Sequence, residues 1–145
     1  MVLGAPFLPT GSVPETAVVV RIIHDPTHPA GLLEDGQGSI QGLASIREHI
    51  AQRNTKARTE QDMSAITLVL RAPLAMLPGE LQQGVQVELW DSPGAGEAGW
   101  STLKDDLRGT LQKADVVLYL LDGSKLGTAL DDQYLQDLVD SVDTV

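Results

Sequence analysis

A short acidic turn, Asp91-Ser92-Pro93-Gly94, is the part of the sequence best suited to chemistry. It follows residues 85–90, where apolar and polar side chains alternate as in a half-buried strand. In open α/β sheets, ligands bind beyond the carboxyl ends of strands. A carboxylate there can orient metal-bound water, and a glycine, which has no Cβ, lets its backbone N–H approach a phosphate. The tetrapeptide therefore suggests a site for phosphate and magnesium. The same residues are also ordinary turn chemistry, and by themselves they favour the turn.

Other groups of residues suggest metal or catalytic sites less strongly. His24 and His28 stand four apart, but Pro26 excludes the helix that would align their rings, so a solvated loop is the better interpretation. Residues 122–145 hold six Asp and one Lys without the spacing of a calcium loop, and they fit a solvated helix face. His49 fits the polar face of a helix, and the chain order by itself assembles no catalytic triad.

The elements around the acidic turn have the pattern of an α/β protein. The sequence predicts strands over 17–23, 66–70, 85–90 and 116–121, and helices over about 39–53, with Ser39 as N-cap, 101–113 and 130–142. The polar, turn-rich stretches 24–38 and 54–61 are predicted connections. Residues 116–121 are apolar throughout, which is typical of a strand buried on both faces, so residues 85–121 predict a βαβ unit. The strands 66–70 and 85–90 are also candidates for an antiparallel pair.

Composition restricts the classes of partner. The 145 residues, 42% of them hydrophobic, suffice for one globular domain. Twenty acidic and ten basic side chains leave a net charge of −10, which repels nucleic-acid phosphates and anionic lipids. The absence of cysteine excludes disulfides and thiolate metal sites, and no apolar run approaches the ~20 residues of a membrane span. The start of the sequence has no secretory leader, so a cytoplasmic location is expected.

Several segments, taken in order, resemble the GTPase domain of the dynamin superfamily. They are the loop 8–16, which contains Leu-Pro-Thr-Gly, the strands 17–23 and 66–70, the Asp-x-Pro-Gly motif 91–94 and the strand 116–121. The resemblance implies that residues 1–145 form part of a P-loop NTPase domain, an α/β sheet with flanking helices that takes GTP and magnesium.

The same resemblance assigns roles to individual residues. It implies that Thr16 is the switch threonine, catalytic and a magnesium ligand, and that Asp91 also serves magnesium. Asp91, Pro93 and Gly94 would contact the nucleotide. Ala95 stands where small signalling GTPases carry glutamine, which points to the large-GTPase branch. The fold alone would instead make Thr16 a strand residue without a ligand.

Two motifs of the family do not appear in the sequence. No lysine follows a glycine, so there is no G-x-x-x-x-G-K-[ST] loop, and no Asn/Thr-Lys-x-Asp motif follows residue 121. Residues 1–7 resemble the tail of the helix that follows the phosphate loop. The first strand of the family's sheet, which lies between the strands 85–90 and 116–121, is missing with that loop. Those two strands are then left unpaired or must pair with each other, and we expect a chain that is poorly stable alone.

These observations leave more than one function open. The first is a fragment of a dynamin-like GTPase, which binds and hydrolyses GTP in its complete parent and does not bind it alone. The alternative is a non-enzymatic module, or truncated product, that pairs its exposed strands or helices with a full-length relative. The third possibility is a coding region with a misassigned start and no separate function. Neither nucleic acid nor a transmembrane segment is expected, and membrane association is expected only through a parent protein.

Overall fold

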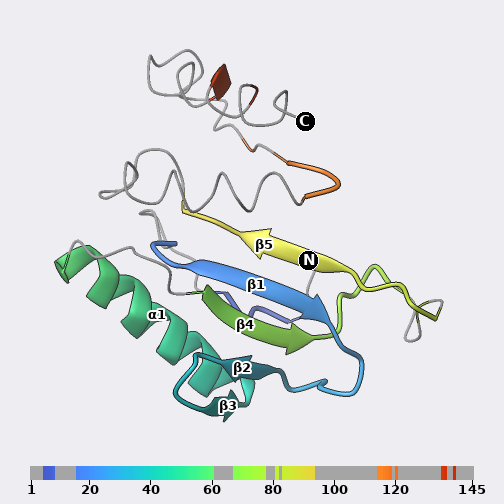
Figure 1. Cartoon of the computed structure of the whole chain (residues 1–145). Helices are drawn as coiled ribbons and strands as arrows, with labels where there is room; N and C mark the ends of the chain where they lie inside the picture. Colours follow the sequence, from blue (N-terminus) through green and yellow to red (C-terminus); the bar gives the residue numbers. More distant parts are fainter. Residues whose placement is uncertain are drawn as a thin grey trace.

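The protein contains a five-stranded sheet with one long helix packed against it (Figure 1). The computed structural model describes residues 5–8, 16–60, 67–77, 81, 83–93, 114–118, 120, 135–136 and 139. The elements in chain order are β1 (Val19–His24), β2 (Leu32–Glu34), β3 (Ser39–Gln41), α1 (Leu43–Glu60), β4 (Thr67–Ala72) and β5 (Glu88–Asp91). The strands lie in the order β3-β2-β4-β1-β5. The α/β class predicted from the sequence is confirmed.

Strand β1 lies between β4 and β5 in the sheet. It pairs in parallel with β4, with Val20 opposite Leu68, and antiparallel with β5, with Val20 opposite Asp91. The predicted direct pairing of the segments around β4 and β5 is therefore wrong, because β1 lies between them. The physical reason is that β1 carries buried aliphatic side chains on both of its faces, Val20 and Ile22 on one and Val19 and Ile23 on the other. Such a strand buries most apolar surface between two neighbours.

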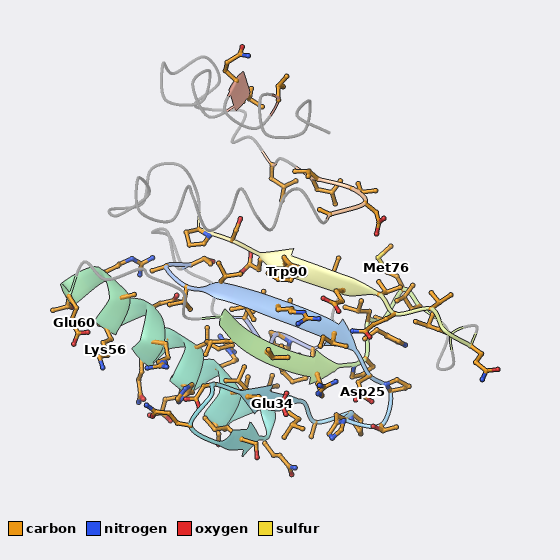
Figure 2. The ribbon with its side chains drawn as sticks, in the orientation of Figure 1. Asp25, Glu34, Lys56, Glu60, Met76 and Trp90 are labelled. Carbon is orange, nitrogen blue, oxygen red and sulfur yellow. The ribbon has the colours of Figure 1, made fainter. Side chains whose placement is uncertain are left out.

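One face of the sheet forms the core with α1. Paired residues share a face, so Val20 and Ile22 of β1 lie beside Leu68 and Leu70 of β4. Ile46 and Ile50 of α1 cover them, and all six side chains are at most 2% exposed. The opposite face carries polar residues, among them Arg21, Glu88 and Trp90, which Figure 2 labels on β5. The sheet thus has an apolar face toward α1 and a more polar face away from it.

Helix α1 begins later and ends later than the sequence predicts. Residues 39–41 pair with β2 as β3, and Gly42, at φ +91°, takes the position before the helix and accepts the N–H of Ile46 at 3.0 Å. The predicted start at Ser39 is wrong because Ser39 pairs in the sheet. The predicted connection 54–61 is wrong over its described part, since 54–60 are helical. Ile46 and Ile50 are continued by Asn54 and Ala57, so one buried stripe runs along the helix at spacings of four, four and three.

The segment 24–38, predicted as a connection, contains the short strand β2 and a turn tied to α1. The carboxylate of Asp35 accepts the N–H groups of Gln37 and Gly38 at 3.0 and 3.2 Å. It also lies 2.9 Å from Nε2 of His49, an ion-pair distance at an angle unsuited to a hydrogen bond. The N–H of Gln37, more than any other group, holds the pKa of Asp35 below its ordinary value, and burial opposes this effect. The turn is thereby fixed against the helix.

Residues 5–8 are not helical, so the described part of the predicted helix tail 1–7 is wrong. Phe7 is 1% exposed and belongs to the core. Its ring lies under Gly31, where an added Cβ would stand 2.5 Å from Phe7 Cε1 and 2.9 Å from Ile46 Cδ1. The absence of a side chain at Gly31 makes room for this ring.

The predicted buried strand 116–121 is not formed in its described residues. Residues 116–118 and 120 have no regular structure, and Val116, Leu118 and Leu120 are 75%, 81% and 91% exposed. The βαβ unit predicted over 85–121 is therefore wrong in its second strand, and β5 forms an edge of the sheet. A strand that is apolar on both faces needs neighbours on both sides, and the described residues supply none. The predicted helix 101–113 lies outside the described residues, and of 130–142 residues 135, 136 and 139 are helical.

Candidate functional site

Thr16 and Asp91, 75 residues apart in the chain, meet at the amino end of β1. Thr16 Oγ1 donates a hydrogen bond to Asp91 Oδ2 at 3.3 Å. Asp91 is the last residue of β5, and Thr16 stands three residues before the start of β1. Because β5 runs antiparallel to β1, its carboxyl end lies at the amino end of β1. The pairing of these two strands thus brings the two predicted site residues together.

The carboxyl group of Asp91 lies in a poorly solvated environment. Burial raises the pKa of Asp91 above its ordinary value, and the hydrogen bond from Thr16 opposes the rise. Its partner in the register is Val20, so it lies on the face of the sheet that carries the core. A carboxylate withdrawn from water gains more from a bound cation than a fully solvated one does.

The rest of the Asp-x-Pro-Gly motif is only partly described. Pro93 is fully buried, so its ring holds the chain in place and presents little surface to a ligand. Gly94, and residues 9–15 of the loop before Thr16, lie outside the described residues. The predictions made for them stay predictions.

A third residue, Asn54 of α1, supports the site indirectly. No described contact joins it to Thr16 or Asp91. Its Oδ1 accepts the N–H groups of Ala17 at 2.7 Å and Val18 at 3.0 Å, the two residues that follow Thr16. The polar sequence around Asn54 predicts a connection and does not indicate this role. The signal that reveals it is its place in the stripe of Ile46 and Ile50, where a polar residue must find a buried partner.

A polar cluster lies beside the site on the opposite face of the sheet. Arg21 of β1 donates to both carboxylate oxygens of Glu88 of β5 at 2.5 Å, and its guanidinium lies 5.4 Å from the centre of the Trp90 ring. The hydrogen bond from Arg21 is the main cause that lowers the pKa of Glu88. These contacts join β1, which begins three residues after Thr16, to β5, which carries Asp91, so they stabilise the pairing that brings the two residues together.

The two histidines considered as metal ligands have separate partners. Nδ1 of His24 accepts the N–H of Leu74 at 3.0 Å, and Nδ1 of His28 lies 2.9 Å from Asp25. Within the described ranges, no three His, Cys, Asp or Glu side chains are grouped to hold a metal ion.

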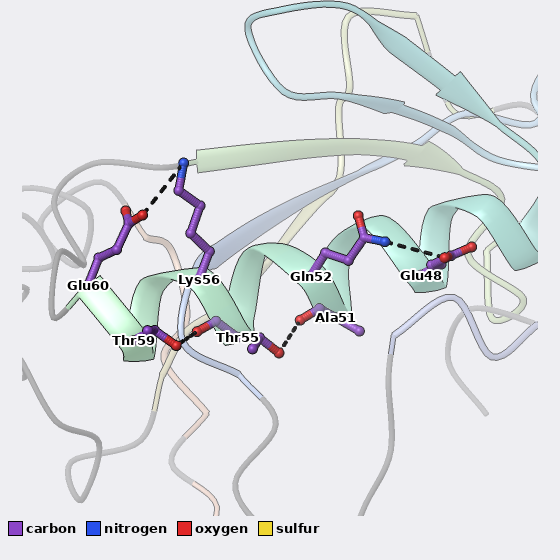
Figure 3. Close-up of a pocket in the computed structure, with 7 residues that line it drawn as sticks. All are labelled: Glu48, Ala51, Gln52, Thr55, Lys56, Thr59 and Glu60. Atoms are coloured by element: carbon purple, nitrogen blue, oxygen red, sulfur yellow. Dashed lines mark hydrogen bonds and ion pairs between the residues drawn. The ribbon is translucent and has the colours of Figure 1, made fainter.

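A surface pocket of about 540 Å³ lies along α1 (Figure 3), and neither Thr16 nor Asp91 lines it. Its polar side chains are occupied with one another one helical turn apart. Gln52 donates to Glu48 at 3.3 Å, Lys56 lies 3.9 Å from Glu60, and Thr55 donates to a backbone carbonyl. Such pairs are ordinary features of a solvated helix surface, so this pocket is not the functional site.

Helix α1 is too polar to cross a bilayer, and the described part of the chain contains no other candidate span.

Comparison with known proteins identifies the family. A search of curated proteins gave no match. The family model of the dynamin family matches residues 1–145, the whole of the sequence. This agrees with the resemblance read from the ordered motifs, and with the mixed α/β sheet, which is consistent with part of a P-loop NTPase domain. The chain belongs to the dynamin family, whose G domains bind GTP.

Proposed function

We propose that this chain supplies the switch-threonine and Asp-x-Pro-Gly part of the nucleotide site of a dynamin-like GTPase. The observation that carries the proposal is the hydrogen bond between Thr16 and Asp91, which unites two distant segments at one end of β1. The match to the dynamin family supports GTP as the nucleotide.

The donor set at this position suits magnesium. Magnesium prefers hard oxygen ligands and is commonly held by one or two protein groups, with water and substrate phosphates completing its shell. The hydroxyl of Thr16 and the carboxylate of Asp91 are two such oxygens, already within hydrogen-bond distance of each other. Bound magnesium would neutralise the negative charge that develops on the phosphates during transfer.

The residues of the chain have distinct roles in the proposed reaction, which is in-line attack of water on the γ-phosphate. Thr16 and Asp91 hold the cation, and Thr16 reports the presence of the γ-phosphate through its place at the end of the switch loop. The backbone N–H of Gly94 would contact that phosphate, while the buried ring of Pro93 fixes the turn. Asp91, since Thr16 donates to it, also orients the threonine hydroxyl before any ligand arrives.

We further propose that the chain acts as part of a larger unit and does not hold GTP alone. Phosphate affinity in these enzymes depends on loop N–H groups and a lysine that follows a glycine, whereas the four lysines here follow Thr, Leu, Gln and Ser. Val116, Leu118 and Leu120 have exposed aliphatic side chains, and β5 is an edge of the sheet among the described residues. Both observations support the need for a further neighbour.

Titration of the chain with a fluorescent GTP analogue and magnesium tests this proposal. We expect no saturable binding below millimolar nucleotide. Micromolar binding by the chain as it stands would refute the claim that the site needs a phosphate cradle from elsewhere. Micromolar binding that survives Asp91→Ala would also refute the role given to Asp91.

A second candidate is a non-enzymatic module that binds a full-length dynamin-like protein. The exposure of Val116, Leu118 and Leu120 favours it, because an apolar stretch of this kind is suited to pairing with a strand of a partner. Co-purification with such a relative, lost when Leu118 and Leu120 are changed to Asn, is the expected result. A solitary species in light scattering at all mixing ratios would count against it.

A further inference from the structure

Asn54 is a fully buried polar side chain at 2% exposure, and it is the only one recorded among the described residues. A buried amide is costly unless it is hydrogen-bonded. Here Oδ1 accepts two backbone N–H groups, those of Ala17 at 2.7 Å and Val18 at 3.0 Å. Both donors lie on a segment 36 and 37 residues earlier in the chain, so the contact is a tertiary link between α1 and the approach to β1.

The two N–H groups depend on this acceptor. Ala17 and Val18 are 0% and 2% exposed, so water does not replace Asn54 there. They precede Val19, where the ladder of β1 with β4 begins. Asn54 therefore does for these two residues what the neighbouring strand does for the rest of β1.

Thr16 directly precedes Ala17 in the chain. Its hydroxyl donates to Asp91 at 3.3 Å. This distance depends on the position of the backbone that follows Thr16. β5, which carries Asp91, pairs with β1 from Val20 onward, whereas Asn54 of α1 accepts the N–H groups of the two residues that directly follow Thr16. A side chain on a helix is a firmer support than one on a loop.

We propose that Asn54 is a positioning residue for Thr16. By accepting the N–H groups of the two residues after Thr16, the amide of α1 keeps the threonine hydroxyl against Asp91. This proposal rests on the proposed function only for the role of Thr16 as a cation ligand. The position of Thr16 against Asp91 does not depend on nucleotide.

The test measures the ordering of Thr16 directly, by nuclear magnetic resonance on the full chain without ligand. Two quantities are followed: the hydrogen exchange of the Ala17 and Val18 amides, and the three-bond couplings that report the χ1 rotamer of Thr16. The variant Asn54→Leu keeps the bulk but removes the acceptor, and Asn54→Asp keeps an acceptor of the same shape. Ile50→Ala, one turn earlier on the same buried stripe, is the matched control that loses packing without losing a hydrogen bond.

In the unchanged protein we expect both amides to be protected and Thr16 to occupy one rotamer. In Asn54→Leu we expect both amides to exchange at least about tenfold faster, relative to Ile22 in the middle of β1, and the Thr16 couplings to average. Asn54→Asp should restore protection and the single rotamer. Ile50→Ala should speed exchange across β1 in general without averaging Thr16.

Three results would overturn the proposal. One is free exchange of Ala17 and Val18 in the unchanged protein, a measurement that needs no variant to fold. The second is a single Thr16 rotamer in Asn54→Leu, and the third is equal averaging in Ile50→Ala. None of these depends on nucleotide or metal, so failure of the proposed cation site would appear separately, in a titration with Mn²⁺.

Discussion

Gly31→Ala tests how tightly the segment before the switch loop is packed. Gly31 has φ +78°, and a Cβ there would meet the ring of Phe7 at 2.5 Å and the end of Ile46 at 2.9 Å. The left-handed backbone costs a side-chain-bearing residue about 1–2 kcal/mol. Overpacking against a buried ring adds about 1–3 kcal/mol. We therefore expect Gly31→Ala to lower the free energy of unfolding by about 2–5 kcal/mol in total.

Gly36→Ala is the matched control, because Gly36 has nearly the same φ, +80°, and open space where its Cβ would stand. The backbone cost is then common to both variants, and their difference isolates the contact with Phe7. In urea unfolding, that difference of about 1–3 kcal/mol corresponds to a midpoint lower by roughly 1 M in Gly31→Ala.

Phe7 provides the second arm of the same test. In Phe7→Leu the smaller side chain leaves room, so adding Gly31→Ala to it should cost less than Gly31→Ala costs in the unchanged protein. Equal midpoints for Gly31→Ala and Gly36→Ala, or strict additivity with Phe7→Leu, would refute the packing of Phe7 beneath Gly31.

The remaining predictions concern charge. Because burial raises the pKa of Asp91, its ionisation costs the folded state more than the unfolded state, and stability falls as pH rises through the folded pKa. Asp91→Asn should therefore increase the free energy of unfolding at pH 7 while it removes the proposed cation ligand, and a loss of stability in urea would contradict this. The pKa of Asp35 is lowered, so its effect on stability has the opposite pH dependence. The ionised Asp35 stabilises the folded state fully above the ordinary carboxyl pKa, and this stabilisation is lost as pH falls through the folded pKa. Asp35→Asn should thus be less stable than the unchanged protein at pH 7, and the gap should close in acid, which denaturant titrations at the two pH values would show. For Arg21 and Glu88, whose side chains are 34% and 22% exposed, a double-mutant cycle should give a coupling of no more than about 1 kcal/mol, weakened by salt, and a larger, salt-independent value would show that solvent screens the pair less than we infer.

The sequence predicted the strands better than their partners. Alternation and β-branched residues located β1, β4 and β5 to within a few residues. Pairing depends on contacts far apart in the chain, and the sequence suggested that β4 and β5 were neighbours when β1 lies between them. Local pattern indicates which residues form a strand, but it does not say which other strand lies beside it.

The prediction of both ends of α1 was wrong for a related reason. Ser39 is a good cap by residue type, but pairing with β2 outweighed that preference and left Gly42 to precede the helix. At the other end, the polar residues after Arg53 suggested a connection. The buried stripe through Asn54 and Ala57 instead extended the helix to Glu60.

For the candidate site, the sequence supplied Thr16 and Asp91 and the structure brought them together, while Asn54 was missed. An asparagine in a polar stretch has many uses, and its two hydrogen bonds to the approach of β1 exist only once α1 packs on the sheet. The apolar run 116–121 shows a second limit of prediction from sequence, this time a predicted element that the described residues do not form. Its pattern predicts a buried strand, and its exposed residues show that the pattern alone does not supply the neighbours a strand requires.

The proposed function requires that Thr16 and Asp91 form one cation site. Titration with Mn²⁺, a paramagnetic substitute for magnesium, tests it most directly through line broadening in the spectrum of the full chain. We predict that the signals of Thr16 and Asp91 broaden together, at lower Mn²⁺ than those of the surface carboxylate Asp25, and that Asp91→Asn abolishes the effect at both. Broadening that reaches Asp25 first, or that persists at Thr16 in Asp91→Asn, would show that Thr16 and Asp91 do not form one cation site.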